Sequence, residues 1–113
     1  MLYVLNAFSP NMLSTSPAVV RFDRITIQEA RGEVDSHGSV VCAIGHQGTA
    51  ALASRLLGRE LDCRRTEIRL GPGDTALIFV LAFRIPEGRV YSEEEVRQLY
   101  QQVRIAVWRA RGP

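Results

Sequence analysis

The fold of this chain is limited above all by one unbroken apolar run, Leu77-Ile78-Phe79-Val80-Leu81-Ala82-Phe83. A run of this length is typical of a central strand that is buried on both faces of a sheet. The turn residues Gly71-Pro72-Gly73-Asp74 precede it, and Pro86-Glu87-Gly88 ends it. Apolar and polar residues alternate over 66–70, so the pattern predicts a hairpin that pairs 66–70 with 77–83.

The remaining segments predict strands and helices in alternation. Alternation or short apolar runs predict strands, and apolar spacing of three and four residues predicts helices. Thr49 and Ser92 are candidate N-caps, and Gly58 is a candidate helix stop. The expected strands are 4–8, 18–27 and 103–108, the expected helices run from Thr49 to 57 and over 93–102, and 28–39 is a loop or short helix. The order β-β-α-β-β-α-β predicts an α/β (α+β-like) fold, a mixed sheet of about five strands with flanking helices.

The size and composition indicate a single domain, 1–113. The chain has 113 residues, of which 46% are hydrophobic and 23% charged, as in ordinary globular proteins. No stretch approaches the roughly 18 apolar residues of a membrane span, and the start lacks the features of a signal peptide. We therefore expect no membrane partner and a cytoplasmic location. Cys42 and Cys63 form no CxxC pattern, so we expect two buried thiols, with neither a zinc site nor a disulfide.

All 14 basic residues are arginine. A GC-rich genome produces the same bias without functional meaning, and we favour that explanation. Each arginine nevertheless carries a planar fork that suits phosphate. The net charge of +2 is too small for a strongly basic binder of long nucleic acid. The chain has no GxxxxGK[ST], GxGxxG, GxSxG or HExxH pattern, so the nucleotide-binding and hydrolase classes that these motifs define lack their signatures.

His46 lies at the start of the predicted helix that runs from Thr49 to 57, next to Gly45. Free backbone N–H groups and the positive end of the helix dipole favour an anion there, so a phosphate could bind beside the imidazole. A lone histidine is more often structural than catalytic, and both interpretations stay open at this point. His37, between Ser36 and Gly38, is expected to be a solvated side chain of a loop.

Polar residues gather at the ends of several predicted strands. Amides can recognise a base or a ribose, and arginine can bind phosphate, so this set suits a nucleotide better than an apolar ligand. Each residue taken alone is more simply a turn residue or a solvated charge. The set comprises Asn6, Ser9, Asn11, Arg64, Arg65, Arg84 and Glu87.

Four of these segments together resemble one protein family. They are Leu5-Asn6-Ala7-Phe8-Ser9-Pro10-Asn11-Met12-Leu13, Ile44-Gly45-His46-Gln47-Gly48-Thr49, Arg65-Thr66-Glu67-Ile68 and Arg84-Ile85-Pro86-Glu87-Gly88. Their order and spacing, from Leu2 to about Trp108, are similar to those of the viral and prophage-type ring nucleases. These are anti-CRISPR proteins of type III immunity, and they have cellular relatives.

The resemblance implies an enzyme that cleaves cyclic tetraadenylate as a homodimer, without metal or other cofactor. It places the general acid on His46, its acidic partner on Glu87 and ligand contacts on Asn6, Asn11, Ser9, Arg65 and Arg84. Gly45, Gln47, Gly48 and Thr49, at the helix start, are further binding candidates. Family members carry a serine where this chain has Gly48, so backbone N–H groups or Thr49 would replace its hydroxyl.

The chemistry that the resemblance implies needs no metal. A ribose 2′-OH attacks its own phosphodiester, Arg84 and Ser9 stabilise the developing charge, and His46 protonates the leaving 5′-oxygen. A hydrogen bond from the imidazole to the Glu87 carboxylate would orient the ring and keep it protonated. The product would be a linear diadenylate with a 2′,3′-cyclic phosphate, a phosphodiesterase reaction that switches off type III CRISPR signalling.

Two other functions use the same residues. A non-catalytic cyclic-nucleotide sponge or a small dimeric RNA-binding module would bind without cleaving. A structural role for the polar strand ends predicts no nucleotide binding. Because 28–39 contains glycines and polar residues, we also expect it to act as a cover over a bound ligand.

Overall fold

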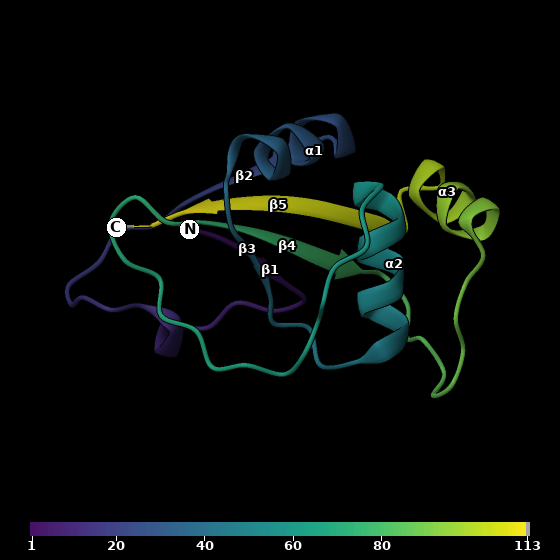
Figure 1. Ribbon diagram of the computed structural model, residues 1–113, viewed down its shortest axis with the longest axis horizontal. Helices are drawn as coiled ribbons and strands as arrows, with labels where there is room; N and C mark the ends of the chain where they lie inside the picture. The colour runs from purple at the N-terminus through teal and green to yellow at the C-terminus, as the bar shows by residue number, and fades with distance from the viewer. Residues whose placement is uncertain (113) are drawn as a thin grey trace.

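A computed structural model describes residues 1–112 as one mixed five-stranded sheet with three α-helices (Figure 1). The strands lie in the order β2-β5-β4-β1-β3. β1 is parallel to β3 and β4, whereas β5 is antiparallel to β4 and β2. The α+β expectation of a five-stranded mixed sheet with flanking helices is therefore confirmed. In chain order the elements are β1 (Leu2–Leu5), the 3₁₀ turn η1 (Pro10–Met12), β2 (Arg21–Ile25), α1 (Ile27–Ser36), β3 (Val40–Cys42), α2 (Gln47–Leu57), β4 (Thr75–Leu81), α3 (Glu93–Gln101) and β5 (Ile105–Arg111).

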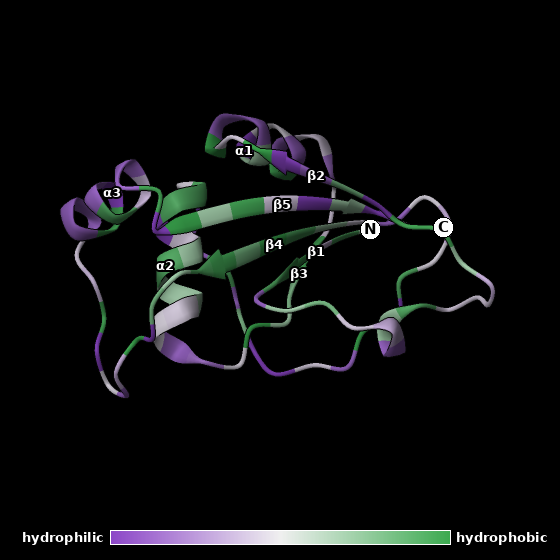
Figure 2. Cartoon of the chain, turned by 180° about the vertical axis from the view of Figure 1, so that it is seen from behind, coloured by the Kyte–Doolittle hydropathy of each residue, from purple (hydrophilic) through white to green (hydrophobic). Residues whose placement is uncertain are grey.

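The apolar run forms the centre of the sheet, as predicted. β4 begins at Thr75 and is buried as far as Phe79, and Val80 is 46% exposed. In Figure 2, β4 is coloured as hydrophobic, while α3 is mostly hydrophilic. The turn before β4 is also confirmed, because the Asp74 N–H donates to the carbonyl of Gly71 (3.1 Å) and Gly73 has φ +83°.

The predicted hairpin between 66–70 and 77–83 is wrong. Both edges of β4 are occupied, by β1 and β5. Ile68 and Leu70 are buried instead against the face of the sheet that the helices do not cover, which we call the second face. Leu70 pairs there with Leu13. The alternation over 66–70 therefore records burial of one side of the segment and not a ladder with β4.

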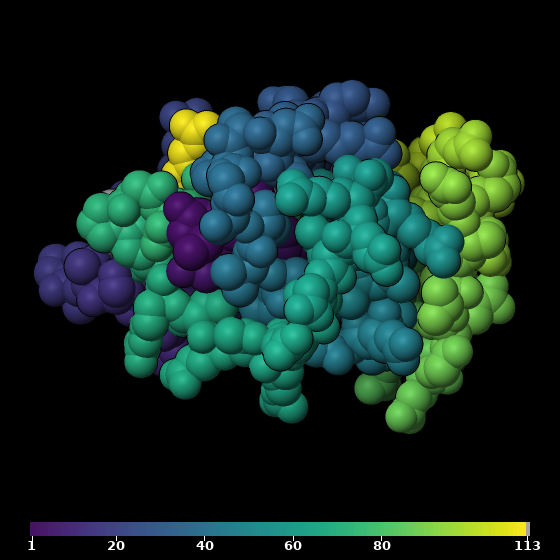
Figure 3. All heavy atoms as spheres, in the orientation of Figure 1, coloured from purple at the N-terminus to yellow at the C-terminus, as the bar shows by residue number. Residues whose placement is uncertain are grey.

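The two faces of the sheet are covered differently. The helices cover one face, where Val4, Leu77, Phe79 and Val107 pack with α1, α2 and α3. Irregular segments cover part of the other face, around Leu5, Leu70 and Ile78. The space-filling view shows the connection after α2, in teal and green, crossing the lower side of the molecule (Figure 3).

The segment 28–39 is mostly helix α1, which confirms the short helix of the two expected alternatives, loop or short helix. Thr26 caps it, with the Thr26 hydroxyl accepting from Glu29 N–H and the Glu29 carboxylate accepting from Thr26 N–H. Its apolar residues Ile27, Ala30 and Val34 are buried in the core. α1 therefore contributes to packing, and the interpretation of 28–39 as a mobile cover is wrong.

His37 is not a solvated loop residue either. It is the C-cap of α1, its side chain is 23% exposed, and its Nδ1 lies 2.7 Å from the carbonyl of Glu33. The Glu33 carboxylate also binds Arg109 (3.1 Å) and Arg111 (3.5 Å) of β5. Among the described residues the Arg109 Nε is buried without a partner. These contacts attach α1 to the sheet.

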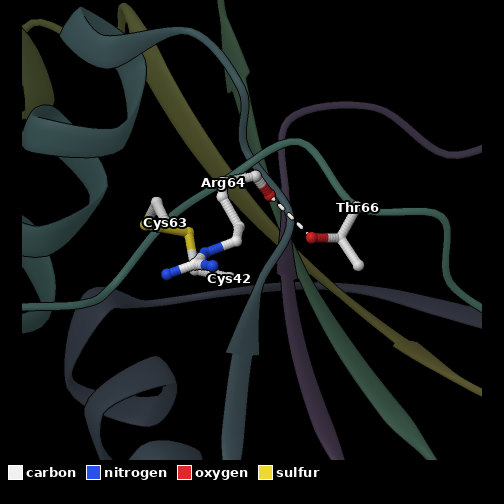
Figure 4. Close-up of a disulfide and its surroundings, with 4 residues drawn as sticks. All are labelled: Cys42, Cys63, Arg64 and Thr66. Carbon is white, nitrogen blue, oxygen red and sulfur yellow. Dashed lines mark hydrogen bonds between the residues drawn. A yellow bond between two sulfur atoms is a disulfide. The ribbon is translucent and has the colours of Figure 1, made fainter.

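The two cysteines form a disulfide, so the expectation of two free thiols is wrong. Cys42 ends β3, and Cys63 lies beside it as an isolated parallel bridge (Figure 4). The two cysteines are 21 residues apart with α2 between them, so no short spacing motif in the sequence indicates that they pair.

No helix within residues 1–112 has the length and apolar character needed to cross a bilayer.

Candidate functional site

The carboxyl ends of β1, β3 and β4 lie at one edge of the sheet because these strands are parallel. Such an edge is where α/β folds commonly bind ligands. Asn6 follows β1, Gly45 and His46 follow β3, and Arg84 follows β4, and all four are exposed. The structure thus brings the predicted polar strand ends to the same edge.

His46 and Glu87 line a common hollow of about 230 Å³. Residues 45–48, at the start of α2, form one wall, and residues 87–90 form the other. The segment after β4 projects from the lower right of the molecule (Figure 3). The turn in this segment has an Arg89 N–H bond to the carbonyl of Pro86 (3.0 Å) and φ +79° at Gly88.

His46, not Thr49, is the N-cap of α2. Its Nδ1 accepts from the Thr49 N–H (3.2 Å) and lies 3.1 Å from the Thr49 hydroxyl. An Nδ1 that accepts this bond carries no proton, so the proton of the neutral ring is on Nε2. The ring is thus fixed by Thr49, which is 6% exposed, and Nε2 makes no hydrogen bond to any residue in 1–112.

Glu87 does not orient the imidazole, contrary to expectation. Among the described residues, its carboxylate makes neither a hydrogen bond nor an ion pair within 4.0 Å with His46. The helix cap takes over the orienting role because Thr49 lies directly above the ring nitrogen in the first turn. Glu87 remains within the same hollow.

Gly48 allows the two walls to approach. A Cβ at this position would lie 2.7 Å from the backbone oxygen of Arg89 and 2.9 Å from Cγ2 of Ile85. No side chain fits there without displacing one wall. This position therefore has no room for a serine side chain.

Arg89 anchors the segment that carries Glu87, and sequence analysis missed it. Its guanidinium stacks on the Tyr91 ring, 4.6 Å from the centroid, and pairs with the carboxylate of Glu95 in α3. Hydrogen bonds from Ser92, first from its backbone, and then the Arg89 charge lower the pKa of Glu95. The only local signal was the Ser92-x-x-Glu95 capping box, which predicts the helix but not its ion pair.

The other residues of the predicted polar set do not line the hollow. Arg65 lies against Gly45, with its Cβ 3.0 Å from where a glycine Cβ would be. Ser9 caps η1 by accepting from the N–H of Asn11, and the Asn11 carbonyl accepts from Arg69. Within residues 1–112, neither Arg65 nor Arg84 has a carboxylate partner, so both guanidinium groups are open to a ligand. Arg64 instead pairs with Asp62 at 2.9 Å.

A larger groove of about 820 Å³ runs along the exposed face of α2. It shares Gly45 and Gln47 with the His46 hollow and continues past Arg55 to Cys63. In the described part of the chain, no group of three His, Cys, Asp or Glu side chains is placed to hold a metal ion.

Sheet order, edge and hollow together define a small α+β protein with a candidate anion-binding site at a helix start. One family model, described as STIV B116-like, matches residues 2–105. The chain belongs to this family.

The family includes proteins of archaeal viruses. ORF116 of Acidianus filamentous virus 1 is 37% identical over 109 residues, 96% of this chain and 93% of that protein. Protein 26 of a Sulfolobus islandicus filamentous virus is 31% identical over 88% of this chain and 84% of its own length. The solved structure of B116 of Sulfolobus turreted icosahedral virus superposes with a TM-score of 0.85, at 31% identity, over 97% of each chain.

Proposed function

We propose that this protein is a ring nuclease that cleaves cyclic tetraadenylate, a phosphodiesterase that acts by transesterification and switches off type III CRISPR signalling. The observation that carries the proposal is the His46 ring, fixed by Thr49, with Nε2 free at the rim of a hollow formed by a helix N-terminus. This geometry suits an anionic phosphodiester. Membership of a viral family agrees with such a role.

In the proposed reaction a ribose 2′-oxygen forms a bond to phosphorus and the bond from phosphorus to the 5′-oxygen breaks. The 2′-hydroxyl proton passes to solvent, and Nε2 of His46 supplies a proton to the 5′-oxygen. A ring that carries both protons would donate Nδ1–H to the Thr49 hydroxyl, 3.1 Å away. Arg84 and Arg65 would bind phosphates of the ligand.

We further propose that the active form is a homodimer. A single 12.6 kDa chain can hardly enclose a ring of four nucleotides, whereas two copies about a two-fold axis offer duplicate sites to a ligand that can share this symmetry. The second face of the sheet is available for this contact. Phe22 and Val80, each 46% exposed, lie on it with the half-buried Trp108.

The first experiment incubates labelled cyclic tetraadenylate with the protein in EDTA and separates the products by thin-layer chromatography. We expect linear diadenylate with a 2′,3′-cyclic phosphate. His46→Ala should lower turnover by about 10²- to 10⁴-fold, the usual contribution of a general acid, and keep most of the binding. His37→Ala, at the end of α1, is the matched control and should turn over normally.

A non-catalytic sponge is the second candidate function. It is favoured by one observation, that Nδ1 of His46 is engaged as a helix cap while Glu87 makes no bond to the ring. A sponge would bind cyclic tetraadenylate tightly and leave it uncut even with excess protein. Normal cleavage by His46→Ala would remove the proposed mechanism.

A further inference from the structure

The Cys42–Cys63 disulfide lies beside the candidate site, and the proposed reaction does not use it. Cys42 ends β3, from which the chain continues through Gly45 to His46. Cys63 is followed directly by Arg64 and Arg65. The disulfide thus joins the segment that supplies the imidazole to the segment that supplies an open guanidinium (Figure 4).

Backbone contacts continue this connection as far as Arg65. The Arg64 N–H donates to the carbonyl of Cys42 (3.2 Å). The Thr66 hydroxyl donates to the carbonyl of Arg64 (3.0 Å), the bond drawn in Figure 4. The Cβ and Cγ of Arg65 lie 3.0 and 3.4 Å from the position of a Cβ on Gly45. Residues 63–66 therefore lie along the outer edge of β3, with the base of the Arg65 side chain over Gly45.

Besides the disulfide, one backbone hydrogen bond, from Arg64 N–H to the Cys42 carbonyl, attaches this segment to the edge of β3. Residues 64–67 are all exposed, and the next buried side chain is Ile68. The ion pair of Arg64 with Asp62 involves side chains that are 73% and 83% exposed, so it contributes little. Cys42 is 3% exposed and belongs to the core, so its covalent bond attaches an otherwise solvated segment to the rigid sheet.

We infer that the Cys42–Cys63 disulfide positions Arg65 beside the His46 hollow, where this guanidinium binds a phosphate of the substrate. The inference rests on the proposed function. Without the disulfide, residues 64–66 leave the edge of β3 more often, and the fraction of molecules with Arg65 in place falls. The apparent affinity for the ring falls by the same factor. The proton transfer at His46 is unchanged, because Thr49 and not Arg65 fixes the imidazole.

The first test needs no ligand. Amide hydrogen exchange is compared between the oxidised protein and the Cys42→Ala/Cys63→Ala double variant. Treatment with a dithiol is a second way to the same state: the dithiol forms its own disulfide, and its two electrons and two protons convert Cys42 and Cys63 to thiols. We expect faster exchange at Arg64 in both cases, with β4 unchanged. Equal exchange at Arg64 in all three samples would overturn the inference.

The second test uses cyclic tetraadenylate and a comparison of variants. We expect the double cysteine variant to raise KM about 3- to 10-fold with kcat little changed. Loss of one charge-assisted hydrogen bond through Arg65→Ala should raise KM about 10- to 100-fold. If the disulfide acts through Arg65, adding the cysteine changes to Arg65→Ala should have almost no further effect.

The outcomes separate the inference from the proposed function. Additive effects on KM, or a fall in kcat with KM unchanged, would overturn the inference while the nuclease activity stands. If the wild-type protein neither binds nor cleaves the ring, the proposed function and the phosphate-binding part of the inference both fail. Exchange at Arg64 would then still decide whether the disulfide holds the segment.

Discussion

Gly48 determines how closely the start of α2 and the segment after β4 approach. Its place in the first turn of a helix is unfavourable for glycine, so the close contact with Arg89 explains its presence better than helix propensity does. The same contact sets how far apart the two walls of the hollow are, one carrying His46 and the other Glu87.

We predict that Gly48→Ala destabilises the protein by about 1–3 kcal/mol, the usual cost of overpacking. The new Cβ would lie 2.7 Å from the backbone oxygen of Arg89, so the wall formed by residues 87–90 must move. The proposed cleavage of cyclic tetraadenylate should then be slower. Urea unfolding measures the first effect and the chromatographic assay the second.

Gly32→Ala is the matched control. Gly32 lies within α1, and nothing is within 4 Å of its Cβ position. Alanine is favoured over glycine in a helix interior by about 0.5–1 kcal/mol, so this change should stabilise the protein. If the two alanine variants shifted stability in the same direction, the steric account of Gly48 would be wrong.

At the scale of elements, α3 and the segment before it are joined by charge. The Glu95 carboxylate accepts from Ser92 N–H (2.9 Å) and pairs with Arg89. The pKa of Glu95 is lowered in the folded protein, so as the pH falls this carboxylate is protonated in the unfolded chain before it is protonated in the folded one. The resulting stability is fully present above the ordinary value of 4.5 and is lost as pH falls through the folded pKa.

We therefore predict that Glu95→Gln flattens the dependence of stability on pH between about 5 and 3. The amide keeps a capping acceptor for Ser92 but no longer changes charge. Urea midpoints across this range measure the effect. Glu93→Gln, in the first turn of the same helix, is the control; an equal flattening in both variants would contradict the role of the Ser92 hydrogen bonds and the Arg89 charge at Glu95.

The sequence allowed those elements to be predicted whose signals are local. β4, α2 and α3 carry an apolar run, a helical period or a cap within their own residues. The strand at 66–70 was wrongly predicted because alternation reports a buried side and not a partner. α1 has few apolar residues, and the Thr26-x-x-Glu29 capping box, a local signal of its start, was missed in the sequence analysis.

The site divides in the same way. The position of His46 at a helix start follows from Gly45 and the apolar spacing that comes after it. The anchor of Arg89 on Tyr91 and Glu95 depends on how a turn folds back, and the disulfide joins residues 21 apart. Such contacts depend on tertiary structure, which spacing along the chain does not encode.

At the scale of the whole molecule, the uncovered half of the second sheet face leads to a prediction about assembly. Val80 of β4 pairs in register with Ala106 of β5, and Trp108 pairs with Ile78. These side chains form a patch near the carboxyl edge that carries Arg84. A dimer through this patch would place two sites close together.

We predict that the protein has about twice the 12.6 kDa mass of one chain in light scattering, and that Val80→Glu gives a folded monomer. A charge in a buried apolar contact is costly without a partner. Val103→Glu is the control, because Val103 is 64% exposed and lies outside the sheet. A dimer that survives Val80→Glu would assign the contact to another surface.

Both ends of the described chain meet at the start of β4. The Met1 carbonyl accepts from Thr75 N–H (3.1 Å), and the Gly112 N–H donates to the carbonyl of Asp74 (2.9 Å) (Figure 1). His46 lies toward the opposite edge of the sheet. A fluorophore or an affinity tag fused to either end would therefore be remote from the imidazole, so labelled and surface-tethered protein should keep the activity of the free chain.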